Sequence, residues 1–236
     1  MANKFIFDVD GTLTPSRQGM NADFQHWFLE FVYDNPVYLV TGSDYPKTVE
    51  QLGDSICENV NRVYNCSGND VWEGGVNIQT NEWALPEAAH EWLSEQLTAS
   101  AFSLRTGLHF EHRPGMCNFS VVGRNANLEE RAKYVAWDAE YNERDVISHN
   151  FNILFLELEA RPGGETGIDI APKGADKSQI ITDFNEDDTL WFFGDRMDQG
   201  GNDYPLAQVV DHYRHVKDWK QTWEYLQIFQ EQGIAT

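Results

Sequence analysis

The stretch KFIFDVDGTLTPSRQ, residues 4 to 18, places two aspartates directly after an apolar run. Asp8 and Asp10 stand on either side of one valine, and a glycine follows them. The apolar run predicts a buried strand that ends in these charges. A divalent cation with oxygen ligands would make such carboxylates tolerable at a strand end. Strand-end aspartates also cap turns without any chemistry, so the pair alone leaves a metal site and a turn open.

Two further apolar runs follow the same pattern. PVYLVTGSD (36–44) and DTLWFFGDR (188–196) each lead into glycine with serine or aspartate. Strands that are apolar throughout are typical of a parallel sheet covered on both faces, and their carboxyl ends share one edge, where open α/β sheets bind ligands. These runs predict an α/β fold with a Rossmann-like parallel sheet.

The middle of the chain has a different texture. A helical stretch (85–97) is followed by alternating segments (107–113 and 116–124) and by a helix-like run (127–143). We therefore expect an α+β cap domain, residues 82–171, inserted between two parts of the core domain, residues 1–81 and 172–236. Near the end of the chain, apolar residues at helical spacing predict a closing core helix: Val216, Trp219, Trp223, Leu226 and Phe229.

Composition excludes several classes of partner. The 236-residue chain has a net charge of −21 and a pI near 4.5, which argues against a nucleic-acid or membrane-surface partner. Three cysteines without CxxC spacing indicate neither a disulfide framework nor a zinc site. The sequence contains no apolar run long enough to span a membrane, so it indicates neither secretion nor a membrane anchor. We therefore expect a cytoplasmic protein.

A local basic cluster could still bind an anion. Arg113, Arg124 and Arg131 lie close together in an otherwise acidic chain, and guanidinium groups suit bidentate phosphate binding. The alternative is a set of surface charges paired with nearby acids such as Glu129, Glu130 or Asp138. A carboxylate such as Asp8 can in turn attack phosphorus, while a second carboxylate protonates the leaving oxygen.

Four segments, in order, resemble the motifs of the haloacid dehalogenase superfamily of phosphatases and phosphomutases. They are FDVDGTLT, LVTGSD, PKGADKS and FFGDRMDQGGND. The resemblance implies that Asp8 is the nucleophile and Asp10 the acid/base, and that the hydroxyl of Thr41 or Ser43 binds the phosphoryl oxygens. It implies further that Lys177 stabilises the phosphoryl charge. The cofactor it implies is Mg²⁺, held by Asp8, Asp10, Asp195 and Asp203.

Within that superfamily the chain is most similar to the eukaryotic-type phosphomannomutases. The segments that carry this likeness are TPSRQ, GSDYPKTVEQLG, RPGMCNFSVVGR with the following EER, and GGETGIDIAPKGADK. The resemblance implies that Arg113, Arg124 and Arg131 grip the phosphate that is not transferred. It also implies that Asn118 and Asp169 line the sugar site, and that Arg17 and Gln18 lie by its core-side entrance.

The expected function is therefore a Mg²⁺-dependent phosphotransferase that interconverts hexose 6-phosphate and 1-phosphate, with mannose as the implied sugar. An aspartyl phosphate and a hexose bisphosphate would be its intermediates. A sugar-phosphate phosphatase is the alternative, because Thr41 stands where the mutases usually have glycine. Gly167 and Lys173 depart from the family's serine and aspartate, so we expect the cap to recognise the sugar hydroxyls differently. A sugar-phosphate binding protein is disfavoured by the intact Asp8 and Asp10, and the resemblance leaves a homodimer open.

Overall fold

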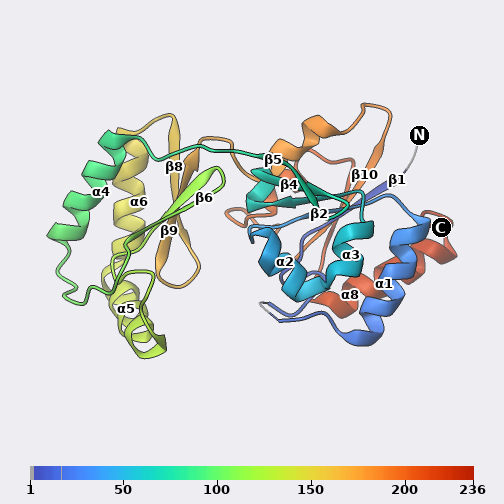
Figure 1. Ribbon diagram of the computed structural model, residues 1–236, viewed down its shortest axis with the longest axis horizontal. Helices are drawn as coiled ribbons and strands as arrows, with labels where there is room; N and C mark the ends of the chain where they lie inside the picture. The colour runs from blue at the N-terminus through green and yellow to red at the C-terminus, as the bar shows by residue number, and fades with distance from the viewer. Residues whose placement is uncertain (1–2, 17) are drawn as a thin grey trace. The chain divides into compact units, whose positions relative to one another are not determined.

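The computed structural model describes residues 3–16 and 18–236 (Figure 1). Its contacts divide the chain into two compact units. The core unit comprises the described residues up to Thr80 and Ala175–Thr236, and the cap unit comprises Asn81–Gly174. None of the helices in the described part of the chain has the length and apolar character needed to cross a membrane.

The core unit is built on a seven-stranded sheet of order β11-β10-β1-β2-β3-β4-β5. From β11 to β3 the neighbouring strands run parallel, while β4 pairs antiparallel with both β3 and β5. The α/β fold with a parallel core sheet is thus confirmed. The strands are β1 (Asn3–Phe7), β2 (Val37–Val40), β3 (Arg62–Asn65), β4 (Asp70–Glu73), β5 (Val76–Thr80), β10 (Thr189–Gly194) and β11 (His212–His215).

Alternate residues of these strands enter two apolar layers, one on each face of the sheet. One layer joins Phe5, Phe7 and Leu39 to the helices α1, α3 and α8, and the other joins Ile6, Val40 and Phe192 to η2 and α7. The helical elements of this unit are α1 (Ala22–Asp34), α2 (Tyr45–Leu52), α3 (Asp54–Asn59), η1 (Cys66–Gly68), η2 (Lys177–Asp183), α7 (Tyr204–Ala207) and α8 (Trp219–Glu231).

The last helix confirms the predicted closing core helix, although Val216 lies before its start and is buried in the same core. Leu226 and Phe229 are buried in it, and Trp219 and Trp223 pack partly buried against the same apolar layer. Asp218 begins the helix by accepting hydrogen bonds from the backbone N–H groups of Lys220 and Gln221.

The cap unit is an antiparallel sheet of order β6-β7-β9-β8 with three helices. Its elements are α4 (Glu87–Ala99), β6 (Phe110–Arg113), β7 (Met116–Phe119), α5 (Leu128–Tyr141), α6 (Glu143–Leu154), β8 (Leu158–Gly163) and β9 (Gly167–Pro172). The predicted α+β character is confirmed. The helix-like run ends earlier than we expected, because Asn142 adopts a left-handed conformation, with φ of 51°, between α5 and α6.

The two faces of the cap sheet differ in chemistry. Cys117, Phe119, Ile168 and Ile170 pack with the cap helices into a second core. Because directly paired residues of antiparallel strands point to the same side, the opposite face carries a row of polar side chains. This polar face of the cap sheet runs from β6 to β8 through Glu111, Asn118, Asp169 and Arg161.

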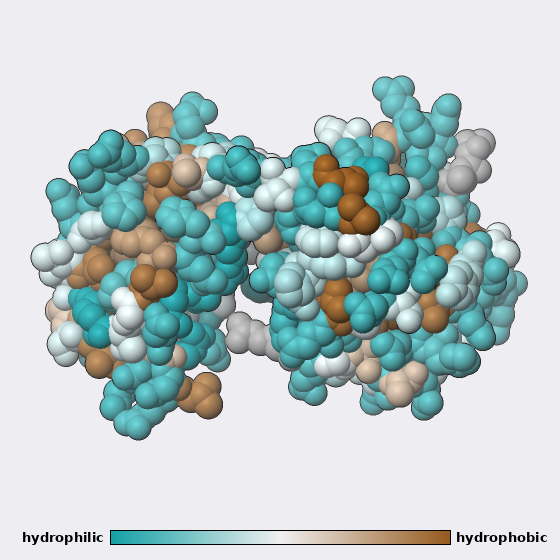
Figure 2. Space-filling model, in the orientation of Figure 1, coloured by the Kyte–Doolittle hydropathy of each residue, from teal (hydrophilic) through white to brown (hydrophobic). Residues whose placement is uncertain are grey.

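Figure 2 shows that hydrophilic side chains dominate the visible surface of both units, as the acidic composition requires.

Candidate active site

The parallel strands of the core unit deliver their chemical residues to one edge of the sheet. Asp8 follows β1, Thr41 follows β2 and Asp195 follows β10, and these three strands are neighbours. The backbone N–H of Asp8 donates to the carbonyl of Phe193, which continues the β1–β10 ladder up to the nucleophile candidate. Residues far apart in the chain therefore meet where a parallel sheet of this kind binds ligands.

Lys177 is the centre of this group. Its side chain is 0% exposed, and its Nζ donates to Oδ1 of Asp8 at 2.5 Å and to Oδ1 of Asp203 at 2.7 Å. Asp203 is held from its other oxygen by the backbone N–H of Arg196 at 3.0 Å. Asp8 also accepts a hydrogen bond from the hydroxyl of Thr12 at 3.1 Å. The four side chains form a buried polar network at the start of η2 and α7.

Three carboxylates of this network could hold a cation together. Oxygen atoms of Asp8, Asp195 and Asp203 lie within 4.8 Å of one another. If all three are ionised, one lysine leaves two negative charges unbalanced, and a divalent ion would neutralise both. Carboxylate oxygens are the hard ligands that Mg²⁺ takes, so the donor set fits the predicted ion.

Burial governs the charge of these groups. It raises the pKa of Asp8 to about 7, with Asp203 and Asp195 adding to the rise and Lys177 opposing it. Burial and Asp203 also raise the pKa of Asp195. Burial alone would lower the pKa of Lys177, but Asp203 and Asp8 more than offset this, so its pKa is raised and it stays charged.

Two glycines, Gly11 and Gly194, allow the carboxylates of the cluster to lie close to the backbone. A Cβ at Gly11, where φ is +85°, would lie 2.3 Å from Oδ2 of Asp195. A Cβ at Gly194 would lie 2.6 Å from Oδ2 of Asp203. Each glycine therefore leaves room for one carboxylate of the cluster, Gly11 after the aspartates that follow β1 and Gly194 at the end of β10.

Asp10 is placed differently from the other aspartates. Its carboxylate is not part of the three-carboxylate cluster found among the described residues; its Oδ1 accepts a hydrogen bond of 3.0 Å from Nε2 of Gln51, on α2. The same amide donates to the hydroxyl of Thr14 at 3.2 Å, and Gln51 is buried. Gln51 therefore orients the acid/base candidate. Gln51 lies in the segment GSDYPKTVEQLG (42–53), whose resemblance gave no signal for this role.

Thr41 and Ser43 lie at the end of β2, the strand beside β1. Thr41 is buried, and its hydroxyl accepts a hydrogen bond of 3.1 Å from the backbone N–H of Ser43. The next residue, Asp44, begins α2 by accepting from the N–H of Lys47 at 3.0 Å. Thr41 thus shapes the loop, and Ser43, which is half-buried, stands at its turn. Gln18 is exposed, and Arg17 lies outside the described residues.

In the cap unit, two of the three arginines share one carboxylate. Nη2 of Arg113 lies 3.1 Å from each carboxylate oxygen of Glu111, and Nε of Arg124 donates to Oε2 of the same group. Arg131, in the first turn of α5, pairs with Glu165 at 3.1 Å. All three arginines thus form ion pairs, but their acids are Glu111 and Glu165, not the acids named from the sequence.

The sugar-site candidates of the cap also contact each other. Nδ2 of Asn118 donates to Oδ1 of Asp169 at 2.6 Å across β7 and β9. A Cβ at Gly167 would lie 2.5 Å from Nδ2 of Asn118, so the glycine that departs from the family pattern leaves space for this amide. The loop that precedes Gly167 is braced by Arg144, which donates to the carbonyls of Gly164 and Gly167 and pairs with Asp138.

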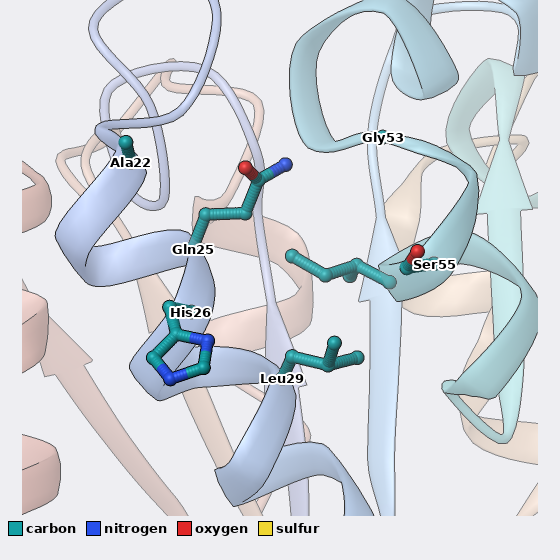
Figure 3. Close-up of a pocket in the computed structure, with 7 residues that line it drawn as sticks. Ala22, Gln25, His26, Leu29, Gly53 and Ser55 are labelled. Atoms are coloured by element: carbon teal, nitrogen blue, oxygen red, sulfur yellow. The ribbon is translucent and has the colours of Figure 1, made fainter.

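A surface pocket elsewhere in the core unit has a volume of about 220 Å³ (Figure 3). It lies between α1 and the start of α3, and its polar lining includes Gln25, His26 and Ser55. The Gln25 amide is already used by the carbonyl of Leu52, at 2.6 Å. None of the candidate site residues that the structure describes lines this pocket, and we assign it no role.

The three cysteines are free and buried. Burial raises the pKa of Cys57 to about 12 and that of Cys117 to about 11, so neither thiol has the character of a nucleophile.

Comparison with known proteins gives one consistent result. A model of the family described as eukaryotic phosphomannomutase matches residues 26–227. A phosphomannomutase of Galdieria sulphuraria is 32% identical over 218 residues, which cover 86% of this chain and 84% of that protein. A phosphomannomutase of Spinacia oleracea is 31% identical over 212 residues, which cover 85% and 84%.

Solved structures agree in fold. A haloacid dehalogenase-like hydrolase from Bacteroides thetaiotaomicron superposes with a TM-score of 0.59 at 12% identity, over 97% of this chain and all of that one. A trehalose-6-phosphate phosphatase of Aspergillus fumigatus gives 0.57 at 14% identity, over 98% of this chain and 94% of that one. At these identities the likeness shows the fold alone.

Proposed function

We propose, since the chain belongs to the eukaryotic phosphomannomutase family, that it interconverts hexose 1-phosphate and 6-phosphate by moving a phosphoryl group through Asp8. The observation that carries the proposal is the position of this carboxylate. Asp8 is 3% exposed at the end of β1, hydrogen-bonded to a fully buried lysine, with Asp195 and Asp203 beside it. A family member with this network has every group that phosphoryl transfer through an aspartate requires.

The first step forms a bond between an oxygen of Asp8 and the phosphorus of a bound hexose bisphosphate, and it breaks the bond from phosphorus to the sugar oxygen. Asp10, oriented by Gln51, gives its proton to that leaving oxygen. Lys177 stabilises the negative charge that develops on the phosphoryl oxygens. Mg²⁺, held by Asp8, Asp195 and Asp203, would supply further charge neutralisation at the same oxygens.

The second step returns the phosphoryl group to the other hydroxyl of the sugar. Asp10 takes the proton of that hydroxyl while the bond between Asp8 and phosphorus breaks. The sugar monophosphate must turn round between the steps, so one set of arginines has to accept either phosphate. We assign this binding to Arg113, Arg124 and Arg131 of the cap unit, and sugar contacts to Asn118 and Asp169.

A sugar-phosphate phosphatase is the second candidate, and Thr41 favours it. The position has a hydroxyl where, by the motif resemblance, the mutases usually have glycine. In a phosphatase, water would replace the second sugar hydroxyl as acceptor of the phosphoryl group. The three cysteines, all free thiols, support the cytoplasm as the place where either activity operates.

Phosphorus NMR tests the two candidates in one experiment. The enzyme is incubated with mannose 1-phosphate or glucose 1-phosphate, Mg²⁺ and a trace of hexose bisphosphate. We expect the 6-phosphate to form faster than inorganic phosphate. Inorganic phosphate as the main product would replace the mutase by the phosphatase, and the absence of both products would refute both.

A further inference from the structure

Glu111 lies in the forks of two arginines that the proposed function assigns to a phosphate. It precedes Arg113 by two residues on β6, so both side chains lie on the polar face of the cap sheet. Nη2 of Arg113 contacts both carboxylate oxygens at 3.1 Å, and Nε of the same arginine contacts one of them at 3.2 Å. Arg124 reaches the second oxygen from the loop after β7.

A carboxylate in this position offers what a phosphate offers. Two oxygens that accept from planar guanidinium groups are the geometry in which arginine binds either anion. The Glu111 carboxylate therefore occupies the donors that a second substrate phosphate would need. The pair is open to solvent, since the side chains of Glu111, Arg113 and Arg124 are 37%, 31% and 26% exposed.

The ion pairs of Glu111 with Arg113 and Arg124 are also weak enough for a phosphate to replace the carboxylate. Burial acts to raise the pKa of Glu111, but the two guanidinium groups outweigh it and lower this pKa, so the group is ionised at neutral pH. Half-exposed ion pairs contribute little net stability, and a dianionic phosphate carries more charge than the carboxylate it would displace.

We propose that Glu111 is an internal competitor of the substrate phosphate, which displaces its carboxylate from Arg113 and Arg124. This inference rests on the proposed function. A carboxylate that returns to the arginines whenever the phosphate leaves them lowers the affinity of the cap for both phosphates of the intermediate. That helps the intermediate to detach and turn round, where a tighter grip would hold it in one orientation.

The cap sheet offers a matched control. Glu159 and Arg161 on β8 repeat the spacing of Glu111 and Arg113, with a contact of 2.7 Å. Glu159 contacts none of the three arginines assigned to phosphate in the described contacts. Replacing it by glutamine makes the same change in net charge on the same sheet without freeing Arg113 or Arg124.

The test is a calorimetric titration with glucose 1,6-bisphosphate. It uses Asp8→Asn protein, in which the phosphoryl group cannot move, and compares it with the same protein carrying Glu111→Gln or Glu159→Gln. We expect Glu111→Gln to lower Kd about five-fold or more, and Glu159→Gln to leave it unchanged. As a second measurement in protein that retains Asp8, Glu111→Gln should lower both KM for hexose 1-phosphate and kcat.

An unchanged or weaker affinity in Glu111→Gln would mean that the carboxylate orients the arginines and does not compete, which overturns the proposal. Equal tightening in Glu159→Gln would reduce the effect to net charge and also overturn it. Either result can occur while the wild type still forms isomer. Conversely, an absence of isomer refutes the proposed function whatever the titration gives, so the two failures are distinguishable.

Discussion

Lys177 donates a hydrogen bond of 2.5 Å to Asp8, a residue 169 positions away in the chain. Lys177 is the cation that the described contacts give to Asp8, and Asp8 is one of its two carboxylate partners. Without this contact, Lys177 would be a fully buried cation facing Asp203, and Asp8 a buried carboxylate beside two more. The contact therefore couples the stability of the core unit to its chemistry, and separate measurements should detect both effects.

Replacing Lys177 by methionine should destabilise the protein by roughly 3–5 kcal/mol, because Asp8 and Asp203 would be left buried without a cation. Turnover should be lost as well. Denaturant unfolding of both proteins measures the difference. Lys47→Met is the control, since the ion pair of Lys47 with Glu50 is exposed and should contribute about 0–1 kcal/mol. Similar losses in the two variants would contradict this account of Lys177.

Replacing Gly11 by alanine should displace Asp195 and abolish activity. The new Cβ would meet the carboxylate at 2.3 Å, in addition to the strain at a φ of +85°. Gly174→Ala separates the two effects, because Gly174 has a φ of +83° but no neighbouring atom within 4 Å of an added Cβ. It should cost about 1–2 kcal/mol of stability and keep its turnover. If Gly11→Ala and Gly174→Ala both keep their activity, or both lose it, contact with Asp195 is not the reason that position 11 needs glycine.

Mg²⁺ should stabilise the folded protein before any substrate is added. Binding to the native state alone raises the unfolding temperature, by about 2–4 °C for each kcal/mol in a chain of this size. EDTA should reverse the shift and stop turnover. Asp203→Asn should abolish the shift, whereas Asp198→Asn, an exposed residue of the same loop, should preserve it. A shift that survives in Asp203→Asn would place the ion elsewhere.

Arg124→Ala should lower the turnover of substrates that carry a second phosphate or must turn round in the site, and it should spare other substrates. For hexose 1-phosphate we expect kcat/KM to fall by the equivalent of about 2–3 kcal/mol, the cost of one charge-assisted contact. Hydrolysis of a small aryl phosphate should survive, because it needs only the residues of the core unit. Arg161→Ala is the control, an arginine of the cap sheet paired with Glu159. Equal losses on the two substrates would show that Arg124 supports the fold.

The strand-end aspartates could be predicted because each one follows an apolar run that itself predicts a strand. Parallel strands bring their carboxyl ends to one edge, so Asp8 and Asp195 had to meet. Lys177 and Asp203 follow no such rule, and they were recognised only from the motif resemblance. Gln51 and Glu111 could not be predicted as site residues, because their roles depend on tertiary contacts. Gln51 reaches Asp10 from a helix 41 residues away, and Glu111 reaches Arg124 across a loop.

The cap was predicted less completely for a similar reason. The alternating segments predicted β6 and β7. In contrast, α6 and the pairing of β8 with β9 depend on the packing of Phe151 and Ile168 into the cap core. The break between α5 and α6 occurs at a single asparagine, Asn142, in the left-handed conformation, and the helical periodicity of the sequence does not predict this break.

Mass spectrometry of the phosphoenzyme tests whether the phosphoryl group passes through Asp8. The enzyme is mixed with glucose 1,6-bisphosphate and Mg²⁺, quenched in acid, and digested with pepsin at the same low pH, at which an aspartyl phosphate survives, and the peptide that contains Asp8 is isolated. We predict that this peptide gains the mass of one phosphoryl group on Asp8 in the wild type and in Ser43→Ala, and gains none in Asp8→Asn. A phosphoryl group on any other residue, or its persistence in Asp8→Asn, would contradict the account.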